Sequence, residues 1–198
     1  MKPWKQVVLI GTLGLVGAMA GLGAAIFTLG PSAVLSTPAG QWALRHVFGH
    51  QATTPDGRAV IGFGDVVPPL QLSGLNGHPH TLPFTGQPVL INYWASWCPP
   101  CVEEMPLLET FANAQGPSGV RVVGIALDDA DEVKDFLMRH PVSFPIYIEP
   151  SGPNDSSVLL GNARGVLPYS VLIGADGSLL KTKLGAFRAS ELEGWVAD

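Results

Sequence analysis

The sequence has few charged residues and only two cysteines. Lys, Arg, Asp and Glu make up 14% of its 198 residues, and no run of Lys and Arg is longer than a pair. The formal net charge is −5, whereas a protein that binds nucleic acid needs a basic face. We therefore expect no nucleic-acid partner, and the lack of a basic cluster also argues against a polybasic membrane patch.

Charge is missing altogether from a long stretch near the amino terminus. After Lys2 and Lys5 the next charged residue is Arg45, and residues 7–29 form a nearly continuous apolar run. A helix needs about 20 such residues to cross the bilayer core. We predict a signal-anchor or transmembrane helix at residues 1–30, with the two lysines keeping its amino terminus in the cytoplasm and the rest of the chain exported.

A cleaved signal peptide is the alternative interpretation of this segment. Ala18-Met19-Ala20 matches the small-residue pattern that precedes a cleavage site behind a short apolar core. The apolar run continues beyond that site without a polar break, which favours the anchor. Both interpretations place the following domain outside the cytoplasm, where disulfides persist.

Alternating strand and helix patterns begin after a segment of mixed composition. Residues 31–63 show little periodicity and contain several Pro and Gly, so we interpret them as a tether. Residues 64–198 have the pattern of one α/β domain that opens with a hairpin, in which Asn76-Gly77 is a typical turn. "PVLINYWA" and "VRVVGIAL" are apolar runs typical of buried strands, and residues with helical spacing follow each of them. This alternation indicates a central sheet covered by helices on both faces.

The two cysteines, Cys98 and Cys101, lie in the stretch "WASWCPPC". A structural disulfide that closes so small a loop contributes only about 2 kcal/mol in the chain-entropy model. Structural zinc needs four ligands, and the one close histidine pair, His78 and His80, lies in the predicted hairpin with nothing to bring it near the cysteines. Covalent haem attachment requires His where this chain has Val102. These interpretations are weaker than a pair that cycles between dithiol and disulfide.

The position of the pair supplies a mechanism for disulfide exchange. Cys98 lies between a predicted strand and a predicted helix, which makes it the helix N-cap, where the dipole and free amides favour a thiolate. Cys101, one turn later, can displace the partner from a mixed disulfide. Pro99 and Pro100 provide no N–H, so we expect only modest stabilisation of the Cys98 thiolate and a comparatively reducing couple.

Two segments, "LINYWASWCPPCVEEMPLL" and "GVLPYSVLIGADGSLL", carry a family resemblance. The chain resembles the TlpA-like branch of the thioredoxin superfamily, which are membrane-tethered thiol–disulfide oxidoreductases of the bacterial envelope and include cytochrome c maturation proteins. The resemblance extends from about Gly64 to the carboxyl terminus. It implies a thioredoxin-like α/β fold, with a central mixed sheet flanked by helices and an N-terminal hairpin. It also implies anchoring in the bacterial inner membrane, with the catalytic domain in the periplasm.

The resemblance implies roles for residues around the cysteine pair. Pro168 matches the proline that the superfamily holds in a cis peptide bond beside the disulfide. Leu167 would then present its backbone groups to a substrate polypeptide. Trp97 and Pro99 would belong to the surface rim where substrates dock.

Glu104 matches an acidic residue of the TlpA-like pattern, three residues after Cys101 and on the same helix face. Its carboxylate would exchange a proton with Cys101 as that cysteine changes state, and the alternative is a solvated helix glutamate. One position departs from thioredoxin itself, since Asn92 occupies the place of a buried aspartate. A neutral amide cannot accept a proton, so Glu104 becomes the candidate for that role.

The sequence therefore predicts an exported enzyme that exchanges a Cys98–Cys101 disulfide with protein disulfide or dithiol substrates, in the reducing direction. A membrane redox partner would restore the dithiol, and no cofactor or metal is expected. One alternative is a thiol peroxidase, but such enzymes need Thr and Pro where this chain has Ala95 and Ile91. The other is a non-enzymatic chaperone that binds soft metals through the cysteines. The substrate, the direction and the oligomeric state stay open.

Overall fold

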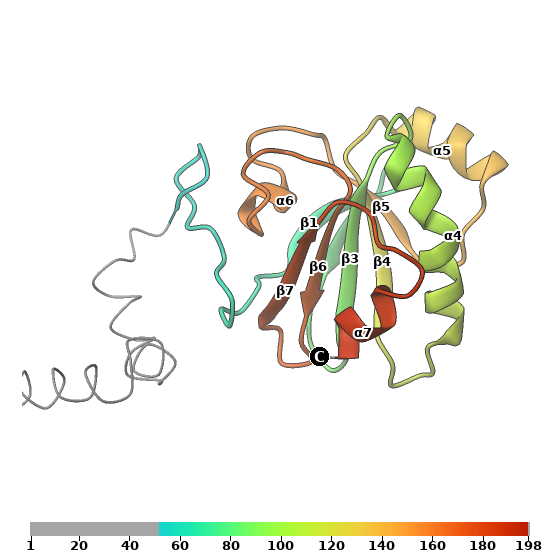
Figure 1. Ribbon diagram of the computed structural model, residues 1–198. Coiled ribbons are helices and arrows are strands. Elements are labelled where there is room, and N and C mark those ends of the chain that lie inside the picture. The colour runs from blue at the N-terminus through green and yellow to red at the C-terminus, as the bar shows by residue number, and fades with distance from the viewer. Residues whose placement is uncertain (1–51, 198) are drawn as a thin grey trace, which may run out of the picture. The chain divides into compact units, whose positions relative to one another are not determined.

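The computed structural model describes residues 52–197 of the chain. Within that range no helix is both long and apolar enough to cross a bilayer. The anchor predicted at residues 1–30 and most of the predicted tether lie outside the described residues, so both stay predictions. The described residues belong to one compact unit built around a single sheet (Figure 1).

Seven strands form this sheet, in the spatial order β2-β1-β5-β4-β3-β6-β7. Their bounds are β1 Leu70–Gly74, β2 Pro79–Leu82, β3 Val89–Trp94, β4 Arg121–Ala126, β5 Ile146–Ile148, β6 Tyr169–Ile173 and β7 Leu179–Leu184. β3 is parallel to β4 and β4 to β5, whereas the other neighbours are antiparallel. The central mixed sheet implied by the resemblance is confirmed.

Helices cover both faces of the sheet, as the alternating pattern predicts. They are α4 Pro99–Ala114, α5 Ala130–Arg139, α6 Ser156–Leu159 and α7 Leu192–Ala197. α4 and α5 lie on one side and α6 on the other (Figure 1). Side chains of α4, α5 and α7 share one apolar core, and α6 belongs to the second. β3 is buried along its whole length, because its alternate side chains enter the two cores in turn.

The junction between β3 and α4 positions the cysteines. β3 ends at Trp94 and α4 begins at Pro99, so a short turn brings Cys98 to the carboxyl end of the central strand. Pro99 and Pro100 occupy the first two helical positions, where their fixed φ suits the helix and their missing N–H has no intrahelical partner to lose. α4 then buries Met105, Leu108 and Phe111 against the sheet.

Residues 52–61, here called the strap, fold against the domain although they belong to the predicted tether. An isolated bridge joins Thr53 to Ala59 across a turn that contains Gly57 at φ 85°. The Arg58 guanidinium donates to the Asn154 carbonyl at 2.7 Å, and the Ile61 amide donates to the Leu159 carbonyl at 2.9 Å. The compact unit of the described residues therefore includes residues that precede Gly64, the domain start predicted from periodicity.

Candidate redox-active site

Cys98 and Cys101 form a disulfide at the amino end of α4, with an S–S distance of 2.11 Å and a Cα–Cα distance of 5.3 Å. Cys98 is the N-cap residue, with the extended backbone that this position requires. It is 5% exposed, whereas Cys101 is fully buried. Only Cys98 therefore borders the surface, which is the arrangement that disulfide exchange needs in an attacking cysteine and its resolving partner.

The first turn of α4 offers few hydrogen-bond donors to the Cys98 sulfur. Its two prolines have no N–H, and the next two amides, of Cys101 and Val102, both donate to the Cys98 carbonyl at 3.1 Å. The Cys98 side chain accepts no capping hydrogen bond. In the disulfide state the Cys101 amide therefore bonds the Cys98 carbonyl and not the sulfur, because the helical turn closes normally.

The turn before Cys98 is fixed by a residue that sequence reasoning did not identify. The Asp128 carboxylate accepts hydrogen bonds from the Ser96 amide at 2.8 Å and the Ser96 hydroxyl at 2.7 Å. Asp128 follows β4, and the carboxyl ends of the parallel strands β3 and β4 meet at one edge of the sheet. The position of Asp128 directly after the predicted strand "VRVVGIAL" was the sequence signal that could have identified it.

Leu167 and Pro168 directly precede β6. The Leu167–Pro168 peptide bond is cis, as the resemblance implies. Leu167 is half-buried and packs against the apolar core that contains both cysteines. No described residue hydrogen-bonds the Leu167 backbone, whereas the Asn162 side chain engages both the amide and the carbonyl of Val166. Leu167 thus has backbone groups available to another chain.

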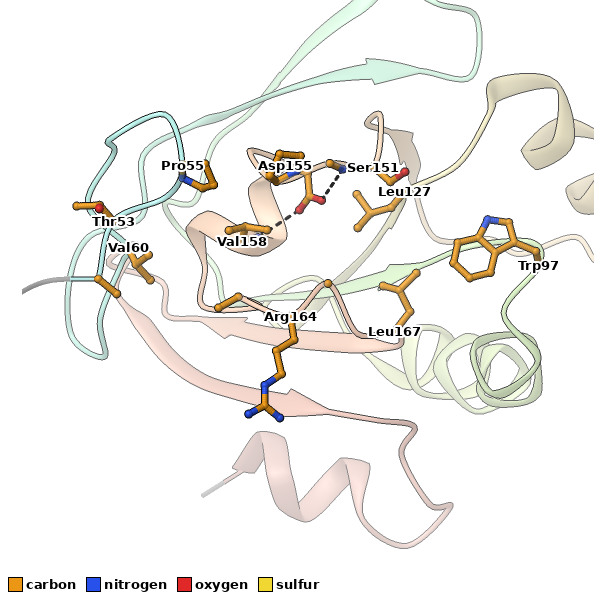
Figure 2. A pocket seen from close by; sticks show the side chains of 15 residues that line it. Thr53, Pro55, Val60, Trp97, Leu127, Ser151, Asp155, Val158, Arg164 and Leu167 are labelled. Atoms are coloured by element: carbon orange, nitrogen blue, oxygen red, sulfur yellow. Dashed lines mark hydrogen bonds between the residues drawn. The ribbon is translucent and has the colours of Figure 1, made fainter.

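Trp97 and Pro99 are exposed next to the disulfide, as expected for a docking rim. The Trp97 side chain is 66% exposed, unusual for so large an apolar residue. Trp97 and Leu167 also line a groove with a volume of about 570 Å³ (Figure 2). Two of the candidate docking residues, Trp97 and Leu167, therefore line the same groove.

Glu104 is buried, so the alternative of a solvated glutamate is wrong. Its carboxylate accepts from the Asn92 side-chain amide at 2.8 Å and from the Phe187 backbone amide at 2.8 Å. Burial raises the pKa of Glu104, and the hydrogen bonds from Phe187 and Asn92 and the nearby Lys183 charge partly offset that rise. The pKa is raised overall, which makes the carboxyl a group able to take up a proton more readily than an exposed glutamate.

The Glu104 network joins segments that are far apart in the sequence. Asn92 also donates to the Ser170 hydroxyl at 3.1 Å, which connects β3, α4 and β6 through buried polar groups. Asn92 was singled out as a departure from thioredoxin, but its bond to Glu104 was not foreseen. The Phe187 amide was also missed, because a backbone donor 83 residues away has no sequence signal.

The described residues contain no group of three or more His, Cys, Asp and Glu that could hold a metal ion.

Comparison with protein families shows a match between residues 63–195 and the redoxin family. The chain belongs to the redoxin family. This redoxin is 28% identical over 128 residues to sporulation thiol-disulfide oxidoreductase A of Bacillus subtilis (strain 168), a match that covers 63% of this chain and 75% of the relative.

Solved structures agree with this assignment. A thioredoxin-related protein from Neisseria meningitidis serogroup B is 33% identical, with a TM-score of 0.57 over 64% of this chain and 96% of that one. A secreted Mycobacterium tuberculosis disulfide oxidoreductase, described as homologous to E. coli DsbE, is 27% identical, with a TM-score of 0.52 over 65% of this chain and 94% of that one. This redoxin is a thiol–disulfide oxidoreductase of the thioredoxin superfamily, consistent with the TlpA-like branch.

Proposed function

We propose that this redoxin reduces disulfides in polypeptide substrates outside the cytoplasm. The observation that carries the proposal is the disulfide between Cys98, at the surface end of α4, and the fully buried Cys101. In the dithiol form, the Cys98 thiolate attacks one sulfur of a substrate disulfide and releases the other as a thiolate. Cys101 then attacks the Cys98 sulfur, releases the second substrate thiol and closes the intramolecular disulfide.

Recharging requires two electrons from another dithiol. We assign this step to a membrane redox partner, because the predicted anchor at residues 1–30 would hold the domain beside the bilayer. The similarity to a secreted mycobacterial oxidoreductase supports a site of action outside the cytoplasm. In the proposal the host is a bacterium, the anchor lies in its inner membrane and the catalytic domain lies in the periplasm. Cytochrome c maturation is one periplasmic process that consumes such reducing power.

Four residues around the pair are assigned to substrate binding. Trp97 and Pro99 provide exposed apolar surface next to Cys98. Leu167 offers an unbonded amide and carbonyl to an extended substrate strand, a common means of peptide recognition. Pro168, whose carbonyl accepts from the Gly185 amide at 2.9 Å, fixes the backbone at which this strand would pair.

Glu104 is assigned to proton transfer with Cys101. Both residues lie on the buried face of α4, three positions apart. Release of Cys101 from the disulfide generates a buried thiolate that needs a proton, and a buried carboxyl with a raised pKa is suited to supply one. Asn92 orients this carboxyl by donating to one of its oxygens.

An insulin-reduction assay with dithiothreitol as electron source tests the proposed activity. Catalysed precipitation of the insulin B chain, together with a reduction potential near or below that of thioredoxin (about −270 mV), is the expected result. A potential near the −120 mV typical of strong oxidants would contradict the reducing direction. Peroxide consumption, or stoichiometric bound metal without disulfide exchange, would instead support one of the two alternatives.

Replacing Pro99 and Pro100 by Ala is expected to make the couple less reducing. Each substitution restores an N–H at the start of α4, and donors at this position stabilise the Cys98 thiolate and hence the reduced form. We expect the reduction potential of the double variant to rise by about 30 mV or more, which corresponds to about tenfold in the equilibrium constant. The measurement is redox equilibrium with glutathione; Pro106→Ala, in the same helix but away from the cysteines, is the control. An unchanged or lower potential in the double variant would show that the missing amides do not limit stabilisation of the Cys98 thiolate.

A further inference from the structure

The strap lines one end of the groove to which Trp97 and Leu167 contribute. Trp97 and Leu167 line the end near the cysteines, whereas Thr53, Pro55 and Val60 line the other. Figure 2 shows the strap residues and Trp97 at opposite ends, with Leu127, Val158 and Leu167 between them. Part of the binding surface therefore comes from residues that precede the family match, which begins at residue 63.

The strap is held in place by its own hydrogen bonds. The Arg58 guanidinium donates to the Asn154 backbone carbonyl at 2.7 Å, and the Asn154 side-chain oxygen accepts a hydrogen bond from the Asp56 amide at 3.1 Å. The Arg58 guanidinium also pairs with the Asp56 carboxylate at 2.7 Å. Thr54, within the strap, is buried, and its amide donates to the Arg58 carbonyl at 2.8 Å. These contacts give the strap a defined conformation against the loop that precedes α6.

The inner surface of the groove is mainly apolar. Val60, Val158 and Leu127 contribute aliphatic side chains to its lining. Asp155 brings a carboxylate, but that group already accepts hydrogen bonds from the amides of Gly152, Ser157 and Val158 as the cap of α6. The Arg164 side chain points away from the strap and from Trp97 (Figure 2). An occupant would thus be selected for apolar side chains.

We propose that the strap forms the distal wall of the substrate groove and binds an extended apolar segment of the substrate polypeptide next to its reactive disulfide. This inference rests on the proposed function. The groove is continuous with Trp97 and Leu167, and Leu167 has free backbone groups with which an extended chain can pair. A substrate strand that enters at Leu167 is directed along the groove toward Val60. The strap would accordingly determine which polypeptides react, and leave the chemistry of the cysteine pair unchanged.

Val60→Asp in the full chain tests this inference. The substitution places a charge in the apolar groove, where a contact of one side chain is worth about tenfold in specificity. With the fully reduced protein, we expect the second-order rate constant for insulin reduction to fall about tenfold. The rate with a small disulfide, 2-hydroxyethyl disulfide, and the reduction potential should both match wild type. Ala59→Asp is the matched control, because Ala59 neighbours Val60, is exposed and does not line this groove; it should alter neither rate.

Two further comparisons distinguish a loss of substrate binding from misfolding of the Val60→Asp variant. Arg58→Ala removes the guanidinium bond to the Asn154 carbonyl and the ion pair with Asp56, leaves the groove lining unchanged, and should lower the insulin rate while sparing the small disulfide. Two disulfide-linked peptides that differ only in three Leu or three Ser beside the cysteine should be discriminated by wild type and no longer by Val60→Asp. Equal loss with large and small disulfides, or an unchanged preference for the Leu peptide, would overturn the inference. Failure of wild type on every disulfide would instead refute the proposed function.

Discussion

Cys98→Ser should abolish disulfide reduction, whereas Cys101→Ser should trap the substrate. Serine lacks the nucleophilic thiolate on which the exchange depends, so we expect the Cys98 variant to lose catalysis by a factor on the order of 10³ or more. Cys98 is chosen as the attacking residue because it is the one of the pair that reaches the surface. In the Cys101 variant, the mixed disulfide forms but nothing displaces the substrate.

Intact-mass analysis under non-reducing conditions separates the two cysteine variants. The Cys101→Ser protein, incubated with a disulfide peptide, should gain the mass of one half of that peptide, and dithiothreitol should remove it. The Cys98→Ser protein should gain no adduct at a comparable rate. Serine is a favourable N-cap residue, so α4 should remain folded in this variant and thermal unfolding can verify it. Adduct formation on Cys101 in the Cys98 variant, at the rate seen for Cys98, would reverse the assigned order of attack.

The local part of the site was predictable because short stretches of sequence encode it. A buried apolar strand followed by Cys98, two prolines and a helical repeat is enough to place a cysteine at a helix N-cap, and the structure has this arrangement. The proline before the last hairpin was identified from the family resemblance, and its cis bond is present. In each case one element and its immediate neighbour define the geometry.

The parts that were missed depend on contacts between distant segments. Periodicity cannot show that the strap belongs to the domain, because its hydrogen bonds to Asn154 and Leu159 span almost 100 residues. Helical spacing places Glu104 on the face of Cys101, but its hydrogen-bond donors, the Phe187 amide and the Asn92 side chain, belong to other segments that the spacing does not reveal. Asp128 reaches Ser96 because β3 and β4 are parallel neighbours, which topology determines rather than sequence spacing.

Glu104→Ala should destabilise the fold, by about 3 kcal/mol at neutral pH. The substitution leaves the buried Phe187 amide without its acceptor, which costs about 1–3 kcal/mol, and opens a cavity beneath α4. Asn92 loses one acceptor but keeps the Ser170 hydroxyl. Denaturant unfolding of the oxidised protein measures the effect. Glu103→Ala is the control, because Glu103 is the exposed neighbour in the same helix and should change stability by less than about 0.5 kcal/mol. Equal effects of the two substitutions would contradict the buried network.

Glu104→Gln tests the charge of this group rather than its packing. The pKa of Glu104 is raised in the folded protein above the ordinary value of 4.5, so the native state binds the proton more tightly than the unfolded chain. The resulting stabilisation is complete below about pH 4.5 and is lost as the pH rises through the raised pKa. The free energy of unfolding of wild type should therefore decrease relative to Glu104→Gln across that window. The same variant should shift the pH midpoint of disulfide exchange downward. A neutral amide, unlike the Glu104 carboxylate, does not oppose formation of the Cys101 thiolate. Identical pH profiles in wild type and variant would show that Glu104 has a structural role alone.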